Sequence, residues 1–399
     1  MSSTPLASHA AKDRLPVSLV TAARTFLPGI IARADEIESG RRLPVDLASS
    51  FAEAGLFRVA MPRQYGGAEL HPADIVRVIE EVSQADGSAG WCVMIGAVTA
   101  TLAATLPDRW ATIIYGSNPN VITGGAVAPT GKAYPVAGGH RVTGRWQWGS
   151  GIQHCQWICG GSIVLEGEQP RQMKNGEPEV HLMIFEASQV EILDTWNSSG
   201  LRGTGSHDFQ VQEAFVPEGR STILGVTPAR ITTPLYRFPF FGLMAISVSA
   251  VALGIARRAI SEFVALAAKK IPAWTQRLLA QKPTIQVQVA EAEAALRSAR
   301  AFLFDTIDAA WELALSGEKL SFDLRRDMRL AAANAVRQSV KAVDLMYEAG
   351  GGSAIHSTNP LQRCFRDVHV VTQHILVNAG IYEQTGRLYL GVGPASPLL

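Results

Sequence analysis

Cysteine is scarce in this chain, and its spacing does not suggest a known framework. The 399 residues contain only Cys92, Cys155, Cys159 and Cys364, with no CxxC pair and far too few for a disulfide-stapled secreted domain. His154 precedes Cys155, but the gap from Cys155 to Cys159 does not suit a closed zinc site. We therefore expect reduced thiols in a cytoplasmic protein that binds no metal.

An excess of either charge sign is also missing. Lysine and arginine together number 36 against 35 aspartates and glutamates, which leaves a formal net charge of +1. Nucleic acids and anionic membranes attract clustered basic side chains, and no basic stripe or charge run occurs in the sequence. We expect neither partner. The balance fits a small substrate of little or no charge.

The first 20 residues lack a sustained apolar stretch, so we predict no signal peptide. One uncharged run, FPFFGLMAISVSAVALGIA from Phe238 to Ala256, is long enough to span a bilayer. It contains Pro239, is rich in small residues and continues into the amphipathic segment RRAISEFVALAAKK. A helix that is apolar on all sides is also what the centre of a large helical bundle needs. We therefore expect a buried helix in a soluble protein.

The chain is too long for one small core, and its periodicity changes twice. Residues 1–118 have apolar positions at helical spacing and predict an N-terminal helical domain. Residues 119–228 contain short alternating runs separated by glycine and proline, which predict a central β-barrel or sandwich. Residues 229–399 return to long helices and predict a C-terminal helical bundle. The predicted fold class is α+β.

Sequence motifs in four stretches, taken together in this order, resemble the acyl-CoA dehydrogenase superfamily. The stretches are FRVAMPRQYGGAEL with EEVSQADGSAGW (57–70 and 80–91), GGHRVTGRWQWGSGIQHCQW (138–157), WNSSGLRGTGSHDFQVQEAFVP (196–217) and YEAGGGSAIHSTNPLQRCFRDVHVVTQH (347–374). The resemblance implies a helical domain, a β domain and a helical bundle in the order already predicted.

The last stretch indicates the branch. Straight-chain acyl-CoA dehydrogenases that resemble it carry a glutamate soon after the Arg-Asp pair, and that glutamate removes the substrate α-proton. Here Arg366 and Asp367 are followed by VHVVTQHILV, with His374 and no carboxylate before Glu383. This pattern is similar to the two-component flavin monooxygenases that hydroxylate phenols, indoles, polyketides or thiophenes.

That resemblance implies the oxygenase component of such a system. It would use reduced flavin (FMNH2 or FADH2) and O2, through a C4a-hydroperoxyflavin, to hydroxylate a small aromatic substrate, and it would assemble as a homotetramer. The run GLRGTG at 200–205 superficially resembles a dinucleotide-binding loop, but a strand-like SHDFQVQ follows it where a helix would be required. We therefore expect a separate NAD(P)H:flavin reductase to supply the cofactor.

His374 and Ser150 are the residues that the resemblance identifies as catalytic. An imidazole can donate a hydrogen bond to the flavin peroxide and assist proton transfer near neutral pH, and a hydroxyl at Ser150 can bond flavin N5. Two plainer interpretations stay open: His374 can satisfy a backbone carbonyl inside the bundle, and the Gly-Ser-Gly sequence around Ser150 is ordinary turn chemistry.

Other positions are expected to line the cofactor. Trp148 and Gly149 precede Ser150, and Trp91 matches a tryptophan that lies near the flavin in related sequences, although a tryptophan in a core helix is equally ordinary. The family's first flavin-binding strand would run through Ala126, Val127 and Ala128, where backbone groups do the binding.

The C-terminal half supplies the remaining candidates. Gly350–Gly352 and Ser353 would let the backbone approach the flavin or its phosphate, because glycine removes steric bulk and bare amides bind anions. Gln373 is a candidate hydrogen-bonding partner of the cofactor. Arg277 is a candidate for binding a flavin phosphate, either in its own subunit or in a neighbouring one.

Three functions remain to be distinguished. The first is the flavin-dependent hydroxylase, the second a true acyl-CoA dehydrogenase performing α,β-desaturation, and the third a non-catalytic member of the fold. His374 in place of a carboxylate favours the first over the second, and the polar pair Ser150 and His374 counts against the third. Tyr236, Phe238, Phe240 and Phe241 either wall a pocket for a planar ring or form plain core.

Overall fold

The computed structural model describes residues 17–318 and 320–393. The prediction that there is no signal peptide concerns the first 20 residues, most of which lie outside the described residues. The N-terminal part is helical, as predicted, down to Gly116. Its principal helices are α1 (Val17–Ala32), α2 (Ala34–Gly40), α3 (Val45–Glu53), α4 (Pro72–Ala85), α5 (Gly87–Thr99) and α6 (Asp108–Ala111).

Local sequence explains where α4 and α5 begin. Pro72 occupies the first turn of α4, where its missing N–H costs nothing, and the preceding His71 accepts a hydrogen bond from the backbone N–H of Ala73. Asp86 ends α4 in extended conformation and caps α5, its carboxylate accepting the N–H of Ala89 at 2.9 Å. The cap turns the chain sharply, so the two helices pack on each other.

The central part is one mixed sheet rather than the two sheets of a sandwich. Its strands run in the order β6-β7-β2-β1-β3-β5-β8, with β4 beside β3. Among the pairings described, only β1 with β3 is parallel. The strands are β1 (Thr123–Val136), β2 (Gly139–Gly149), β3 (Trp157–Glu166), β4 (Gln169–Pro170), β5 (Val180–Glu186), β6 (Glu191–Leu193), β7 (His207–Pro217) and β8 (Ser221–Thr222).

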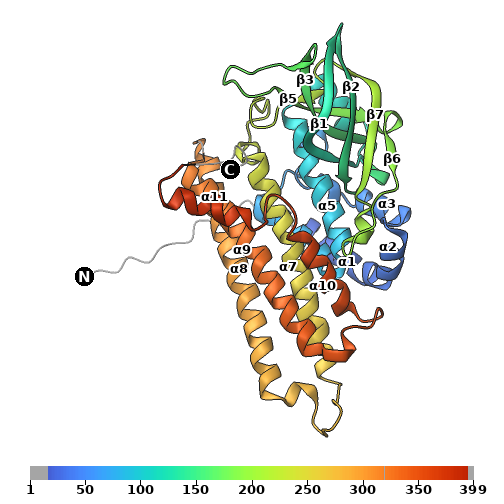
Figure 1. Cartoon of the computed structure of the whole chain (residues 1–399), viewed down its shortest axis with the longest axis vertical. Helices are drawn as coiled ribbons and strands as arrows, with labels where there is room; N and C mark the ends of the chain where they lie inside the picture. The colour runs from blue at the N-terminus through green and yellow to red at the C-terminus, as the bar shows by residue number, and fades with distance from the viewer. Residues whose placement is uncertain (1–16, 319, 394–399) are drawn as a thin grey trace, which may run out of the picture.

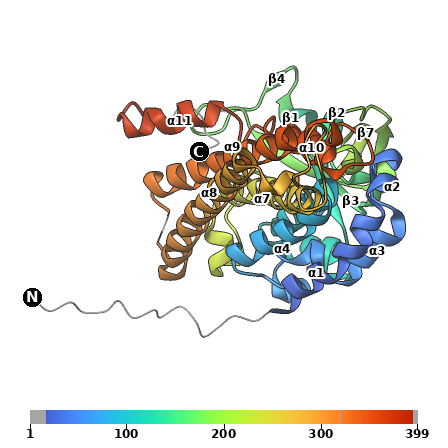
Figure 2. The same cartoon turned by 90° about the horizontal axis from the view of Figure 1, so that it is seen from below.

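The C-terminal part is a helical bundle, as predicted. Three long helices form its shaft, and a shorter helix lies along them (Figure 1). The helices are α7 (Phe240–Ala267), α8 (Pro283–Ser316), α9 (Phe322–Gly350), α10 (Pro360–Val371) and α11 (Gly380–Tyr389). Figure 2 shows α7 enclosed between α4 on one side and α8, α9 and α10 on the others.

Two helical segments in the described part are long and apolar enough to cross a membrane by length and composition. In Gly87–Ala104 every residue of the apolar window is buried inside the protein, and in Phe240–Ala267 83% of the window is buried. The second contains the uncharged run found in the sequence. Both therefore occupy the position of core helices, which is the arrangement expected for that run.

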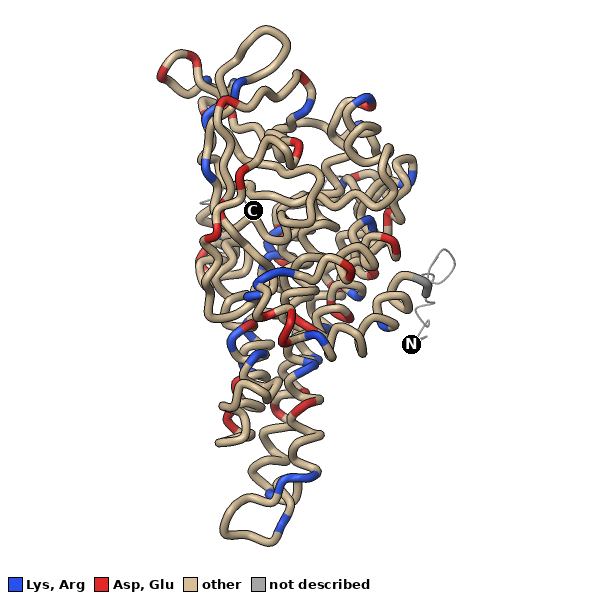
Figure 3. The backbone as a smooth tube through the Cα atoms, turned by 90° about the vertical axis from the view of Figure 1, so that its right-hand side faces the viewer, with Lys and Arg blue, Asp and Glu red and all other residues tan. Residues whose placement is uncertain are grey.

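Helix α5 lies where the three parts meet. It packs against α4, α7, α10 and strand β1, and every residue from Gly87 to Thr99 is buried. Acidic and basic positions are interspersed along the surrounding backbone (Figure 3), and ion pairs tie the parts together, with Arg300 on Glu80 at 2.9 Å and Arg366 on Glu38 at 2.6 Å. Residues carried by α5 are therefore held at a junction of all three parts.

Candidate active site

Trp91, Ser150 and His374 come together at this junction. The indole Nε1 of Trp91 donates a hydrogen bond to Ser150 Oγ at 3.0 Å. On its other side, the Trp91 ring meets the imidazole of His374 edge to face, with ring centroids 5.7 Å apart. The structure thus brings together three residues predicted separately, one from each part of the chain.

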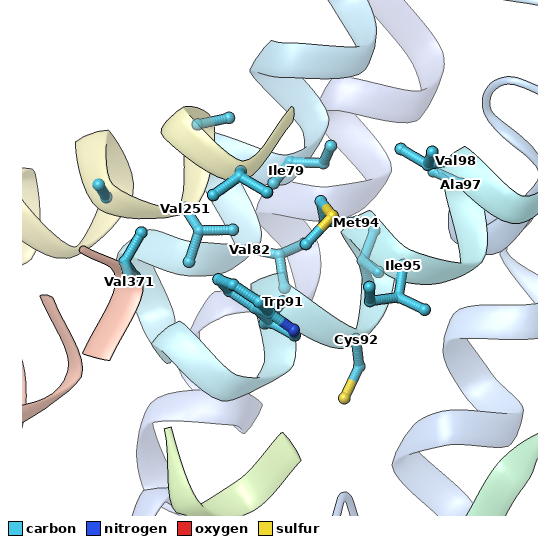
Figure 4. Packing of buried hydrophobic residues seen from close by; sticks show 14 of the residues in the cluster. Ile79, Val82, Trp91, Cys92, Met94, Ile95, Ala97, Val98, Val251 and Val371 are labelled. Atoms are coloured by element: carbon cyan, nitrogen blue, oxygen red, sulfur yellow. The ribbon is translucent and has the colours of Figure 1, made fainter. Parts of the chain in front are cut away.

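The position of Trp91 follows from the close packing of α5 on α4. A Cβ added at Gly90 would lie 1.8 Å from the hydroxyl oxygen of Ser83, so only glycine allows this approach. The neighbouring Trp91 then lies among Val82, Val251 and Val371, from α4, α7 and α10 (Figure 4). Its six-membered ring is core and its N–H points towards Ser150. The core interpretation of this tryptophan therefore holds for its ring, and its N–H is engaged by Ser150.

Trp148 presents its ring to solvent from a strained backbone. Its φ is +64°, in the left-handed region, and its side chain is 66% exposed. The strand is irregular here, because the register of β2 with β7 shifts between Trp146 and Gly149. Strain and exposed apolar area of this kind persist where a site uses them. A planar ligand covering this indole would explain both, two residues from the buried hydroxyl of Ser150.

His374 follows the last turn of α10 and is neutral. Burial and the nearby positive charge of Arg329 lower the pKa of the imidazole to about 4. Its Nδ1 accepts the backbone N–H of Leu376 at 3.3 Å, so the ring proton is on Nε2. The plainer interpretation, in which this histidine satisfies a backbone carbonyl, does not describe the bond seen.

Three functional candidates were missed by the sequence analysis. Thr204 and Ser206 extend the hydrogen bonds of Ser150 away from Trp91; both lie in the quoted stretch 196–217, whose hydroxyls were the available signal. Arg329 on α9 is buried, and burial lowers the pKa of its guanidinium to about 10. A buried arginine within a helix has no sequence signal of its own.

Several other predicted residues lie beside this cluster. Gly149 is adjacent to Ser150, and Gln373 precedes His374, where its exposed amide donates to Thr372. Val127 and Ala128 fall within the irregular part of β1, where its register with β3 shifts between Ala126 and Gly131. Strand backbone freed from the ladder in this way can bind a ligand.

The remaining predicted residues lie at the other end of the bundle. Gly352 and Ser353 follow α9, and α10 then rises roughly 18 Å before His374 is reached. Arg277 is exposed in the loop that joins α7 to α8, at the end away from the sheet (Figure 1). These residues lie apart from the Trp91 site within one chain. Of the three, Ser353 borders a separate open hollow of about 420 Å³, which Lys269 and His356 also line.

The aromatic residues at the start of the C-terminal part are divided between two environments. Phe238 is buried against Trp311, which favours plain core. Tyr236 is tied down by a hydrogen bond from its hydroxyl to the carbonyl of Ala60 at 3.1 Å. Phe240 and Phe241 are partly exposed and meet edge to face at 5.5 Å, so these two remain candidates for a pocket wall.

The residues of the site fit a flavin. The buried hydroxyl of Ser150 and the neutral imidazole of His374, with its proton on Nε2, offer hydrogen-bonding groups on either side of Trp91. The exposed indole of Trp148, two residues before Ser150, offers a stacking surface. Within residues 17–318 and 320–393, no group of three or more His, Cys, Asp or Glu could hold a metal ion.

Comparisons with known proteins identify the family of this chain. Residues 17–108 match the acyl-CoA dehydrogenase N-terminal domain, and residues 246–379 match its C-terminal domain. The chain is 36% identical to an indole-3-acetate monooxygenase of Pseudomonas putida over 91% of both proteins. It is 29% identical to the flavin-dependent monooxygenase oxygenase subunit HsaA of Rhodococcus jostii, over 88% of this chain and 92% of that one.

A solved structure shares the whole architecture. XiaF from Streptomyces sp., determined in complex with FADH2 and glycerol, is 25% identical and superimposes with a TM-score of 0.88 over 96% of this chain and 97% of XiaF. Family domains and overall fold thus point the same way. This chain belongs to the acyl-CoA dehydrogenase family, in its branch of flavin-dependent monooxygenase oxygenase components.

Proposed function

We propose that this chain hydroxylates a small aromatic substrate, using reduced flavin and O2 at the site formed by Trp91, Ser150 and His374. The observation that carries the proposal is the neutral imidazole of His374 against Trp91, at the position where a dehydrogenase of this family would need a carboxylate. A half-buried imidazole whose pKa is lowered to about 4 is a poor base for removing an α-proton. Desaturation is therefore the weaker candidate.

In the proposed site, Trp148 would stack against the flavin and Ser150 would bond its ring edge. Bound reduced flavin would supply the electrons that activate O2, and one atom of that O2 would be transferred to the substrate. The imidazole of His374 would hold its proton at Nε2, directed into the site, while Nδ1 is fixed by Leu376. Burial of this face by α5, α7 and α10 would exclude water.

The reduced flavin would come from a separate NAD(P)H:flavin reductase. The run GLRGTG ends in a short turn, Arg202–Thr204, and continues into strand β7. A nicotinamide dinucleotide site of the usual kind needs a helix N-terminus at that point to receive the phosphates. The loop instead holds hydroxyls against Ser150, which supports delivery of flavin from outside.

The substrate would be a phenolic, indolic or polyketide-like ring. The relatives are named for indole-3-acetate and, in Rhizobium sp., for resorcinol. The partly exposed Phe240 and Phe241 at the start of α7 would give such a ring an apolar wall. We place the protein in the cytoplasm, where its buried free cysteines would stay reduced.

We further propose a homotetramer in which neighbouring subunits complete each flavin site. Gly352, Ser353 and Arg277 lie too far from Ser150 to hold the same cofactor within one chain. A neighbour placing this end of its bundle near Ser150 would supply them. Light scattering tests the oligomeric state. In a tetramer, Arg277→Ala should weaken flavin binding, whereas Arg42→Ala, an exposed control on the N-terminal part, should not.

The function is tested by mixing purified protein with reduced FMN or FAD, O2 and a panel of phenols and indoles. Incorporation of one ¹⁸O atom from ¹⁸O2 into a product, seen by mass spectrometry, supports the hydroxylase. Bleaching of bound oxidised flavin by an acyl-CoA, without oxygen incorporation, supports the dehydrogenase instead. Binding of neither flavin form would overturn the proposal.

A further inference from the structure

Ser150 is the first of three buried hydroxyls arranged in a chain. Its Oγ lies 2.6 Å from Ser206 Oγ, which lies 2.6 Å from Thr204 Oγ1. Thr204 Oγ1 in turn lies 2.8 Å from the carbonyl oxygen of Leu201. Ser150, Ser206 and Thr204 are only 5%, 4% and 1% exposed. Water therefore does not compete for these contacts. If one of the hydroxyl protons pointed away from its neighbouring oxygen, a buried polar group would lack a hydrogen-bond partner.

The carbonyl of Leu201 fixes the donor-to-acceptor direction of the hydrogen bonds along these three hydroxyls. Each hydroxyl has one proton, and a carbonyl oxygen can only accept. The Leu201 carbonyl oxygen also accepts the N–H of Thr204 at 3.1 Å and the indole N–H of Trp196 at 3.2 Å. Thr204 Oγ1 still donates to it, because without that proton two oxygens would face each other at 2.8 Å. Ser206 must then donate to Thr204. Ser150 has to donate to Ser206, because the Ser206 proton is already used.

Ser150 is consequently left without a proton for a ligand. Its own proton points to Ser206, and one of its two lone pairs accepts the N–H of Trp91 at 3.0 Å. The second lone pair is what it can still offer. At the edge of the site, Ser150 is therefore an acceptor and not a donor.

We propose that Thr204 and Ser206 are positioning residues that hold Ser150 as an acceptor, and that this makes the site select reduced over oxidised flavin. The inference rests on the proposed function, because it takes flavin as the group that Ser150 meets. Reduced flavin carries a hydrogen on N5, whereas oxidised flavin has a lone pair there. An acceptor hydroxyl attracts the first and repels the second.

This selectivity suits a protein that receives its flavin from another enzyme. The site would take up the reduced form from solution and give up the oxidised form after turnover. The preference for reduced flavin would be set by the direction of the hydrogen bonds from Ser150 to Leu201. The presence of a serine at position 150 would not be enough. Serine at position 150 with a free proton could bond either redox state.

The test compares dissociation constants for oxidised and anaerobically reduced flavin, with FMN and FAD each tried. The wild type should bind the reduced form more tightly. Ser206→Ala frees the Ser150 proton to face the ligand, so the ratio of oxidised to reduced Kd should fall roughly 3- to 10-fold, the worth of one hydrogen bond. Thr204→Val should act in the same direction, because Ser206 can then donate to Ser150. Thr204→Ser keeps the hydroxyl and should keep the ratio.

Ser162→Ala is the matched control. Ser162 is also fully buried, but its hydroxyl donates to Gly160 within β3 and does not touch the chain. It should leave the Kd ratio unchanged. A Ser206→Ala protein that unfolds at the same temperature as the control and keeps the wild-type ratio overturns this inference. If Ser206→Ala does not fold, the comparison of Thr204→Val with Thr204→Ser tests the inference instead. Equal ratios of oxidised to reduced Kd in these two variants would overturn the inference.

Failure of the inference and of the proposed function can be told apart. If the wild type incorporates oxygen from O2 with reduced flavin, but the Ser206 and Thr204 variants keep its ratio of oxidised to reduced Kd, the proposed hydroxylase function stands. Only the positioning role of Thr204 and Ser206 is then wrong. If the wild type binds neither flavin form, both fall.

Discussion

The indole N–H of Trp91 and the hydroxyl of Ser150, 59 residues apart in the chain, share a buried hydrogen bond of 3.0 Å. Trp91 comes from the centre of α5 and Ser150 from the turn after β2. The bond therefore fastens the sheet to the helix that all three parts of the molecule enclose. It also uses a lone pair of Ser150 that would otherwise face a ligand.

Trp91→Phe tests this bond while keeping an aromatic ring in the core. Losing one buried donor to a hydroxyl should reduce the free energy of unfolding by about 0.5–1.5 kcal/mol, measured by urea denaturation. Oxygen incorporation should fall while reduced-flavin binding persists. Trp91→Leu, which also removes contacts with Val82 and Val371, should be more destabilising. Equal losses in both variants would contradict a specific role for the N–H.

His374→Asn tests the imidazole. The variant should bind reduced flavin but lose hydroxylation by roughly 10²- to 10⁴-fold, the usual worth of a positioned acid–base group. Oxygen consumption should continue, with hydrogen peroxide released in place of hydroxylated product. Product yield and peroxide are measured together.

His369→Asn is the control for that substitution. His369 lies on α10, five residues before His374, but its Nε2 bonds Asp344 and its ring packs on Phe365. It should lower stability slightly and leave the ratio of product to peroxide unchanged. If His374→Asn also kept that ratio, His374 would have no part in the chemistry.

The depressed pKa of His374 predicts how its contribution to stability depends on pH. The pKa is about 4 in the folded protein and 6.5 at its ordinary value, so between these values the unfolded chain binds more protons. Stability is therefore lost as the pH falls from about 6.5 towards 4. His374→Asn removes this part of the loss. Urea unfolding at pH 7, 5.5 and 4.5 should show a shallower decline for the variant than for the wild type, and parallel declines would contradict the prediction. His154, whose pKa is also lowered to about 4 by burial, should leave a residual decline.

Asp367 should show the opposite pH dependence. Burial and the neighbouring Asp86 raise its pKa to about 7 from 3.8, so the folded protein binds more protons between these values. Its ionisation costs stability as the pH rises through that window. Asp367→Asn should therefore gain stability relative to the wild type from pH 4 to 7, and then level off, in thermal or urea unfolding.

Asp367→Ala separates charge from hydrogen bonding at the same position. Asp367 Oδ1 accepts the backbone N–H of Leu201 at 2.6 Å, a bond that asparagine can keep and alanine cannot. Leaving that buried N–H unsatisfied should cost about 1–3 kcal/mol at any pH. Because Leu201 anchors the hydroxyl chain, the alanine variant should also lower the preference for reduced flavin. Alanine and asparagine variants of equal stability would show that the bond contributes little.

The sequence predicted the parts of the fold that are encoded locally. Helical spacing, strand alternation and the stop at Gly350 depend on residues close together in the chain. The described structure changes from helix to strand between Gly116 and Thr123, and from strand to helix between Thr222 and Pro234. The pattern after Asp367 likewise singled out His374, because the missing carboxylate is visible in ten consecutive residues. The prediction of a barrel or sandwich was less specific, since strand pairing joins residues far apart.

Tertiary structure alone decided what those residues can do. The neutrality of His374 depends on its burial and on Arg329, 45 positions earlier, and the acceptor character of Ser150 depends on a carbonyl at Leu201. In the folded chain, Gly352 and Arg277 also lie apart from Ser150 and His374, with which the sequence analysis had grouped them as residues that line the flavin. Residue types and their local order are written in the sequence, whereas the direction of a proton is set by neighbours that only the folded chain brings within hydrogen-bonding distance.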